Sequence, residues 1–359
     1  MRERAIELLE ELTTIDGISG HEKYVSRYLK TQYEDLADEI VYDNLGSIFA
    51  IKKSKTPNAK RVMVSGHMDE VGFLVRVIND NGTISMHPIG GWFSQNLLSH
   101  RVTITNSKGE TFKGAIASVP PHLLSEQQRN QPYNIDAMLI DIGATSKQEV
   151  LDKGIKTGDM IVLEGSFERL SEDRLLSKAF DNRYGCAISV QILEALKDVE
   201  LPFDLVVGAT VQEEVGLRGA KSAANMIKPD LSIVLDCSPA NDLNGDRKAL
   251  GFLGEGVLVR VVDGNFIAHQ GFIEYFVDIC QQHNIKHQPF ISAGGTDAGA
   301  IHTSGNGIPT LTCCICARNI HTSSSVMDLN DYESALNALK ELLISLNNDK
   351  IEAITKSNR

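Results

Sequence analysis

The chain has 359 residues, of which 42% are hydrophobic and 23% charged, an ordinary globular composition and a length sufficient for two domains. The net charge of −12, without a cluster of Lys and Arg, argues against nucleic acid and anionic membranes as partners. No apolar run approaches the roughly 20 residues that span a bilayer. The charged start MRERAIELLEELTTIDG lacks the apolar core of a secretory signal, so we expect a cytoplasmic protein.

The first 68 residues are expected to form two helices followed by strands. Residues 3–12 and 21–36 place apolar side chains three and four positions apart, which predicts amphipathic helices. Residues 43–53 and 61–66 have the short apolar runs typical of strands.

Between about residues 70 and 165 the pattern changes to short apolar runs separated by turns. The turns NDNG, NSKG and KTGD are flanked by alternating segments such as TISMHPI and RVTIT, which predicts a small β-rich domain. One short helix is expected within it, because Ser146 and Glu149 have the spacing of a capping box and Gly154 follows as a stop.

From about residue 170 onward, apolar strands alternate with helices, which predicts an α/β sheet covered by helices on both faces. The N-terminal strands are expected to join this sheet. We therefore expect one α/β domain from residues 1–69 and 166–359, interrupted by an inserted β-rich domain at 70–165. The expected helices are 181–199, 271–284 and a closing helix 328–346, and the expected strands are 204–211, 231–237 and 308–316.

The six cysteines include no CxxC pair, and three of them lie in the apolar run TLTCCIC. This favours buried, reduced thiols that act as small hydrophobic side chains over a thiolate metal site.

Acidic and histidine side chains follow the predicted strands. The carboxyl ends of parallel strands form the ligand-binding edge of an open α/β sheet, so these side chains are expected to meet there. Each taken alone has an ordinary alternative, such as a structural histidine or an aspartate that caps a helix. The residues at this edge are His67, Asp69, Asp181, Glu213, Glu214, Asp236 and His321.

Two imidazoles with several carboxylates are the ligand set of Zn²⁺ or a similar divalent ion. Two such ions need a bridging carboxylate, and together they polarise a carbonyl and activate a water. A ligating carboxylate is a poor base, so a free neighbour must take the proton from the water. The adjacent Glu213 and Glu214 suit this division, provided that they lie where the strand breaks into a loop.

Six segments in chain order resemble the motifs of the M42 family of metallo-aminopeptidases, with the closest likeness to its bacterial glutamyl aminopeptidases. These segments are SGHMDEVGF, SKAFDNRYG, VQEEVGLRGA, LDCSPA, GGTDAGAIH and ARNIH. The resemblance implies that Glu213 is the general base and that Asp69 supports His67. The metal ligands it implies are His67, Asp181, Glu214, Asp236 and His321, with Asp181 bridging two zinc or cobalt ions.

The resemblance also implies a mixed sheet with an inserted β-barrel, and barrel-mediated dimers that assemble into a tetrahedral dodecamer. The insertion carries the apolar stretches WFSQNLL and SVPPHLLSEQQRNQPYN, which suit such contacts, although plain surface loops remain the alternative. The activity implied is removal of N-terminal residues from peptides.

A preference for acidic N-terminal residues requires a cation in the substrate pocket, and Arg pairs with a carboxylate through two hydrogen bonds. We expect Arg260 to be that cation, unless it is a surface arginine, and Gly295 and Thr296 to line the pocket. One departure weakens this expectation, because ISA stands before GGTDA where similar glutamyl enzymes often have a lysine.

Several other functions remain open at this point. A leucyl or broad-specificity aminopeptidase, a two-metal deacylase and a two-metal carboxypeptidase would share the ligand set. A glycoside hydrolase fits less well, because its two carboxylates must face each other across the scissile bond. A non-enzymatic binding protein would be expected to lack a ligand or the base, yet each position is filled.

Overall fold

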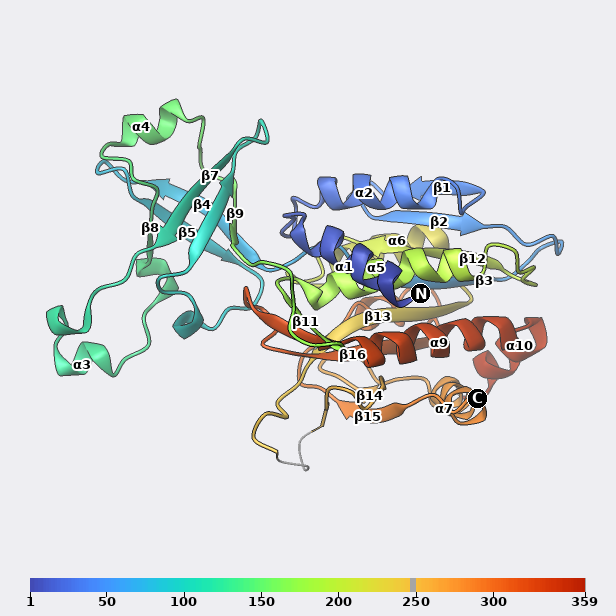
Figure 1. The fold of residues 1–359 in the computed structure, drawn as a ribbon. Helices are drawn as coiled ribbons and strands as arrows, with labels where there is room; N and C mark the ends of the chain where they lie inside the picture. Colours follow the sequence, from blue (N-terminus) through green and yellow to red (C-terminus); the bar gives the residue numbers. More distant parts are fainter. Residues whose placement is uncertain (246–249, 359) are drawn as a thin grey trace.

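The computed structural model describes residues 1–245 and 250–358. Its two parts are a sheet domain, built from both ends of the chain, and a closed barrel that lies to one side of it (Figure 1). No helix of the described residues has the length and apolar character needed to cross a bilayer.

The sheet domain is organised around one mixed sheet. Its central strands β12, β3, β13 and β16 run parallel, and the outer strands pair antiparallel except for β14 and β15, which are parallel to each other. The strand order is β1-β2-β12-β3-β13-β16-β17-β11-β10, and β14 pairs with β15 and β16. The strands are β1 Glu39–Tyr42, β2 Ile48–Lys52, β3 Arg61–His67, β10 Glu168–Arg169, β11 Arg174–Ser177, β12 Asp204–Thr210, β13 Leu231–Pro239, β14 Val257–Val262, β15 His287–Ile291, β16 Thr310–Arg318 and β17 Ser325–Asp328.

The central strands send alternate side chains into two cores. In β3, Val62 and Val64 enter the larger core, while Met63 enters a second core on the opposite face. In β12, Val207 and Val206 divide in the same way. Because both faces are covered, these strands have continuous apolar sequences rather than alternating ones.

Helices pack on both faces of the sheet. The larger core takes in α1, α2, α5, α7, α9 and α10, and the second core takes in α6 and α8. The helices are α1 Arg2–Thr14, α2 Lys23–Tyr33, α5 Phe180–Ala195, α6 Arg218–Ile227, α7 Gln270–Gln282, α8 Ala298–Ile301, α9 Leu329–Ser345 and α10 Asn348–Lys356. The predicted closing helix is therefore α9, and α10 follows it without having been predicted.

The barrel closes in the strand order β4-β5-β8-β7-β6-β9 around its own apolar core. Together with the sheet domain, it confirms the predicted fold class, a mixed α/β sheet with an inserted small β-barrel. Its elements are β4 Gly72–Ile78, β5 Ile84–Ile89, η1 Ser94–Asn96, β6 Arg101–Thr105, β7 Thr111–Ile116, η2 Pro121–Leu123, α3 Glu126–Arg129, η3 Ile135–Ala137, β8 Leu139–Asp141, α4 Lys147–Asp152 and β9 Met160–Leu163.

The short helix predicted within the insertion is α4. Ser146 caps it by accepting a hydrogen bond from the Glu149 backbone N–H, and Gly154 follows with a φ of 72°. The reciprocal half of the capping box is missing, because the Glu149 carboxylate accepts from the backbone N–H and the hydroxyl of Thr145 instead.

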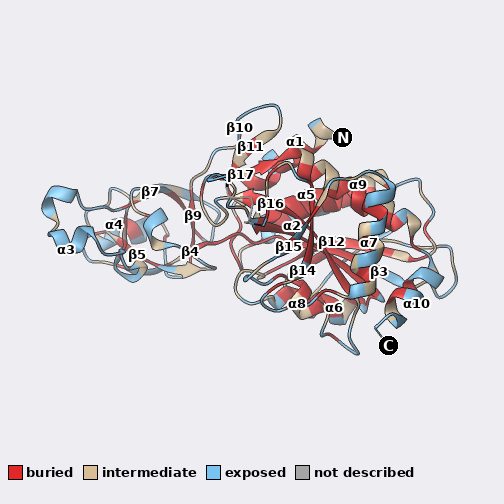
Figure 2. Ribbon diagram, turned by 90° about the horizontal axis from the view of Figure 1, so that it is seen from below, coloured by how far each residue is buried: buried red, intermediate tan, exposed pale blue. Residues whose placement is uncertain are grey.

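One segment of the barrel, residues 118–137, projects away from the rest of the molecule and contains α3 (Figure 1). Figure 2 shows that α3 is exposed, whereas the centre of the sheet domain is buried. Val119 and Leu123, in this segment, leave 42% and 68% of their surface exposed.

All six cysteines are free and buried, which confirms the prediction of reduced thiols. Cys313, Cys314 and Cys316 lie in β16.

Candidate functional site

The predicted site residues converge at one edge of the sheet. His67 ends β3, and Thr210 at the end of the neighbouring β12 stands opposite it in the register. Asp236 lies in β13, which is parallel to β3 on its other side. Asp181 stands at the start of α5, where its backbone is still extended, and His321 follows β16. The structure therefore brings together side chains that are distant in the sequence.

The cluster has two sides that share one aspartate. On the first side, Nε2 of His67 lies 3.2 Å from Oδ1 of Asp181 and 3.7 Å from Oδ1 of Asp236. On the second side, Nε2 of His321 lies 3.4 Å from Oδ2 of Asp181 and 3.2 Å from Oε1 of Glu214. Asp181 thus turns a different oxygen to each imidazole, which is the arrangement expected of a bridging carboxylate.

Both imidazoles are oriented by a contact at their other nitrogen. Nδ1 of His67 lies 3.0 Å from the backbone carbonyl of Asp69, and Nδ1 of His321 lies 2.8 Å from the carbonyl of Gly91. An N–H donated to a carbonyl fixes the ring and leaves Nε2 free to face the site. Gly91 belongs to the segment after β5, so the barrel contributes directly to the geometry of the site.

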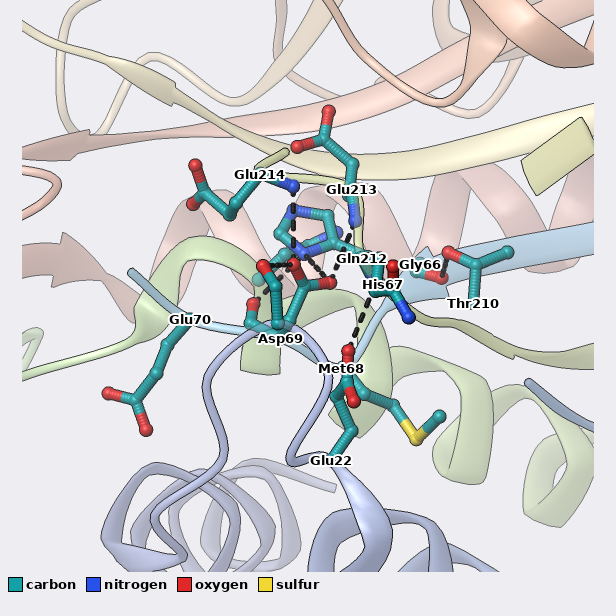
Figure 3. A network of polar contacts seen from close by, with 12 residues as sticks. Glu22, Gly66, His67, Met68, Asp69, Glu70, Thr210, Gln212, Glu213 and Glu214 are labelled. Atoms are coloured by element: carbon teal, nitrogen blue, oxygen red, sulfur yellow. Dashed lines mark hydrogen bonds and ion pairs between the residues drawn. The ribbon is translucent and has the colours of Figure 1, made fainter. Parts of the chain in front are cut away.

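The two glutamates lie on a loop whose backbone is hydrogen-bonded to the side chain of Asp69. β12 ends at Thr210, and the Asp69 carboxylate accepts hydrogen bonds from the backbone N–H of Glu213 at 3.0 Å and of Glu214 at 3.2 Å. In Figure 3 the carboxylates of Glu213 and Glu214 point away from Asp69. The carboxylate of Asp69 thus binds the backbone of the loop, and its oxygen Oδ1 also lies 3.4 Å from Nδ1 of His67.

Burial and crowding of like charges dominate the electrostatics of the cluster. Burial raises the pKa of Glu213, Glu214 and Asp236 above the ordinary carboxyl value. Burial alone would lower the pKa of His321, but its contacts with Asp181 and Glu214 raise it to about 11. Several buried carboxylates therefore lie close to only two imidazoles. A bound cation would relieve the repulsion among these carboxylates.

Two observations show that the cluster fits divalent metal ions. Oε1 of Glu214 is buried and accepts no hydrogen bond from the described residues, although Nε2 of His321 is near it. One ligand atom each from His67, Asp181 and Glu214 also lies within 4.8 Å of the others. The same is true of His67, Glu213 and Asp236, so proximity alone does not separate a base from a ligand.

Two of the predicted substrate residues, Arg260 and Thr296, donate hydrogen bonds to Asp263, an acid that was not predicted as part of the site. Arg260 is only 2% exposed, so it is not a surface arginine, and it donates hydrogen bonds to Asp263 at 3.1 Å and to Ser238. Thr296 is buried and donates to the same Asp263 oxygen at 3.0 Å. Gly295 is exposed beside them.

Two further buried acids border the site. Asp297 contacts the hydroxyl of Thr210, and burial raises its pKa to about 7. Glu22 accepts a hydrogen bond from the backbone N–H of Gln212, the residue before the glutamate pair. Asp297 lies within the motif GGTDAGAIH, but only folding brings Glu22 near the site.

The mixed sheet, the inserted barrel and the cluster of histidines and carboxylates at the strand ends fit a metal-dependent hydrolase. A family model described as M42 glutamyl aminopeptidase matches residues 46–338. The chain belongs to the M42 family of metallopeptidases, and its activity is the hydrolysis of N-terminal residues from peptides.

Relatives and solved structures agree with this assignment. The chain is 38% identical over 348 residues to the glutamyl aminopeptidase of Lactococcus lactis, covering 96% of this chain and 98% of the relative. It is 30% identical over 344 residues to the lysyl aminopeptidase of Pyrococcus furiosus, covering 95% and 97%. A TET aminopeptidase of the archaeon Thaumarchaeota archaeon SCGC AB-539-E09 superposes with a TM-score of 0.94 at 37% identity, covering 98% and 99%.

One similar structure is informative about assembly. The TET1 peptidase of Pyrococcus horikoshii, at a TM-score of 0.86 and 29% identity, covers 95% of this chain and 100% of its own, and can assemble into a tetrahedron or a large octahedral shell.

Proposed function

We propose that the cluster binds two divalent metal ions, zinc or cobalt. The observation that carries this proposal is that Asp181 faces His67 with one oxygen and His321 with the other. The first ion would take His67, Asp181 and Asp236, and the second would take Asp181, Glu214 and His321. Imidazole and carboxylate ligands suit zinc and cobalt alike.

The chemistry follows from what each residue can do. Two ions bound there would polarise the scissile carbonyl and make a water acidic enough to deprotonate at neutral pH. Glu213 takes the proton from the attacking water at a carboxylate oxygen and delivers it to the leaving amine. Asp69 accepts a hydrogen bond from the Glu213 backbone N–H, which keeps the Glu213 carboxylate directed to the site.

Acidic N-terminal residues are the proposed substrate preference, with Arg260 as the selecting cation. In support, Arg260 contacts Ser238, which lies two positions beyond Asp236 on β13, and one relative is a glutamyl aminopeptidase. The pairing of Arg260 with Asp263 weakens this positive charge. The existence of a lysyl relative shows that preference varies among similar chains.

The proposed assembly is a tetrahedral dodecamer built from dimers, in which the inserted domain at residues 70–165 makes the dimer contacts. The exposed apolar side chains of Val119 and Leu123 and the assembly of the Pyrococcus horikoshii peptidase support it. Peptides would be the substrates within such an assembly.

The activity is tested with metal-stripped protein, to which Co²⁺ or Zn²⁺ is returned before adding Glu-p-nitroanilide or its N-acetylated form. We expect metal-dependent cleavage of the free-amine substrate and no cleavage of the blocked one. Cleavage of the blocked substrate at a similar rate would favour a deacylase instead.

The substrate preference is tested with Arg260→Ala, assayed on Glu- and Leu-p-nitroanilide. The wild-type chain should favour Glu, and the variant should lose most of this discrimination through a higher KM for Glu. Arg61→Ala, which removes a half-exposed arginine near Asp204, is the matched control. Retention of full discrimination by Arg260→Ala would remove Arg260 as the selector.

A further inference from the structure

The loop that carries the glutamate pair is held by three successive backbone N–H groups. Gln212 donates to Oε1 of Glu22 at 3.0 Å, and Glu213 and Glu214 donate to the two oxygens of Asp69. Figure 3 shows Glu22 and Asp69 on one side of this loop and the two glutamate carboxylates on the other. Two carboxylates from the N-terminal part of the chain therefore determine how the loop leaves β12.

The residue that Glu22 binds has an unusual backbone conformation. Gln212 has a φ of 56°, in the left-handed region that residues other than glycine rarely adopt. This conformation ends the strand direction, so that Glu213 and Glu214 can both face the site instead of alternating across the sheet. A left-handed non-glycine residue persists only where its surroundings hold it, and the hydrogen bond to Glu22 is one such restraint.

Hydrogen bonds fix the segment that carries Glu22 against its neighbours. Glu22 is 5% exposed and immediately precedes α2. Ser19, three residues earlier, donates a hydrogen bond to Asp69 at 2.6 Å, and the carbonyl of Gly17 accepts from the backbone N–H of Glu70. The segment from Gly17 to Glu22 thus contacts both the His67–Glu70 segment and the glutamate loop.

The environment of Glu22 is an unfavourable one for a carboxylate. Among the residues that the structure describes, no Lys or Arg forms an ion pair with it, and the Asp69 carboxylate is close enough to repel it. Burying an acid without a cation costs stability. Its carboxylate is compensated instead by backbone N–H groups, those of Gly20, Glu22 itself and Gln212, and the bond from Gln212 is the one that reaches the glutamate loop.

We propose that Glu22 is a positioning residue for the reaction: it holds Gln212 in its left-handed conformation, so that the carboxylate of Glu213 is aimed at the attacking water. This inference rests on the proposed role of Glu213 as general base. Glu22 itself touches neither substrate nor metal.

The test compares Glu22→Leu, which removes the acceptor at similar volume, with Glu22→Gln, which keeps an acceptor oxygen. We expect Glu22→Leu to lower kcat by roughly 10- to 100-fold, since a small misplacement of a reacting group costs about this much. KM and the number of bound metal ions should stay within about twofold, and Glu22→Gln should recover most of the rate. Glu34→Leu, at the exposed end of α2, is the control for changes in the helix.

A double variant tests the mechanism of positioning. Glycine adopts the left-handed conformation without cost, so Glu22→Leu should lower kcat less in a Gln212→Gly background than in the wild-type background. Additive losses in the two backgrounds would contradict a role through Gln212.

Three other results would overturn the proposal. The first is a kcat for Glu22→Leu within twofold of wild type. The second is an equal loss in the Leu and Gln variants, and the third is a loss that follows the metal content or the melting temperature. Glu213→Gln is measured alongside: if it stays active, the proposed general base is wrong, whereas an inactive Glu213→Gln with an active Glu22→Leu refutes only the role of Glu22.

Discussion

The orientation of a few side chains decides what this cluster can do. His67 and His321 each have Nδ1 against a backbone carbonyl, so both present Nε2 to the shared Asp181. The sequence could supply the identity of these residues, because they follow apolar strands in a recognisable order. It could not supply the carbonyl of Gly91, because a backbone group carries no side-chain signal and lies 230 positions from His321.

The two adjacent glutamates should respond differently to the same substitution. Glu213→Gln is expected to lower kcat by about 10²- to 10⁴-fold, the usual contribution of a general base, while both metal ions stay bound. Glu214→Gln is expected to lose one ion per chain, because it removes a charged ligand from the His321 side. Elemental analysis and kcat, measured on the same samples, would show the roles exchanged if Glu213→Gln were the variant that lost metal.

Arg260 shows how far residue-level prediction reaches. Its type and position in a strand could be read from the sequence, and its burial and its contact with Ser238 agree with a place near the site. Its pairing with Asp263 could not be foreseen, since the short turn after β14 brings the acid back to it. The strength of the proposed acidic preference would depend on this pair and therefore on the fold.

Among the elements, β3 and α5 determine how closely the two sides of the site approach each other. A Cβ on Gly66 would lie 2.9 Å from the Cα of Gly185, so the strand and the helix touch through two glycines. β3 ends at His67 and α5 carries Asp181, which makes this contact a determinant of their separation.

Gly66→Ala should therefore weaken both the fold and the site. Overpacking of this kind costs about 1–3 kcal/mol, and the displaced His67 should bind its metal ion less tightly. Thermal unfolding of the metal-free variant measures the first effect, and metal titration measures the second. Gly294→Ala is the stability control, because its new Cβ would meet only the Ser292 hydroxyl at 3.6 Å. An unchanged melting temperature for Gly66→Ala would contradict the close packing.

The buried cysteines of α5, α7 and β16 should be protected from thiol reagents. Burial raises the pKa of Cys186 to about 11 and those of Cys280 and Cys314 to about 12, so their reactive thiolate forms are scarce at pH 8. We expect the native protein to react negligibly with an aromatic disulfide reagent, and all six thiols to react once guanidinium unfolds it. Rapid modification of any thiol in the native state would contradict its burial.

Element types followed from sequence more readily than their boundaries. The strands of the sheet domain were predictable because burial on both faces gives a continuous apolar sequence. Its helices were predictable because burial on one face gives apolar residues three and four positions apart. The reciprocal half of the capping box at Ser146 was not, because Thr145 offers Glu149 a second partner that spacing alone does not reveal. α10 was not predicted, although the shorter α4 was, from its Ser146 cap and the Gly154 that follows it.

At the scale of the whole molecule, the barrel contributes to the site and carries the surface proposed for assembly. Its Gly91 carbonyl orients His321, while residues 118–137 project outward with exposed apolar side chains. No pattern within one chain could show whether such a segment is covered, because the proposed partner surface belongs to another copy.

Native mass in solution tests the proposed assembly. Light scattering after size exclusion should give about twelve times the 39.3 kDa of one chain. Leu123→Asp, together with Val119→Asp, places charge on the projecting segment and should shift the mass to smaller species if the segment lies in a subunit contact. A wild-type protein that remains a monomer at micromolar concentration would contradict the dodecamer.

Two metal ions, joined by Asp181, are proposed to act together. The most direct test is a titration of metal-stripped protein with Zn²⁺ or Co²⁺, following the initial rate on Glu-p-nitroanilide and the metal bound per chain. Two ions that act together should give little activity at one equivalent, full activity at two, and no metal-dependent activity in Asp181→Asn. Full activity at one equivalent, or an active Asp181→Asn variant, would contradict this proposal.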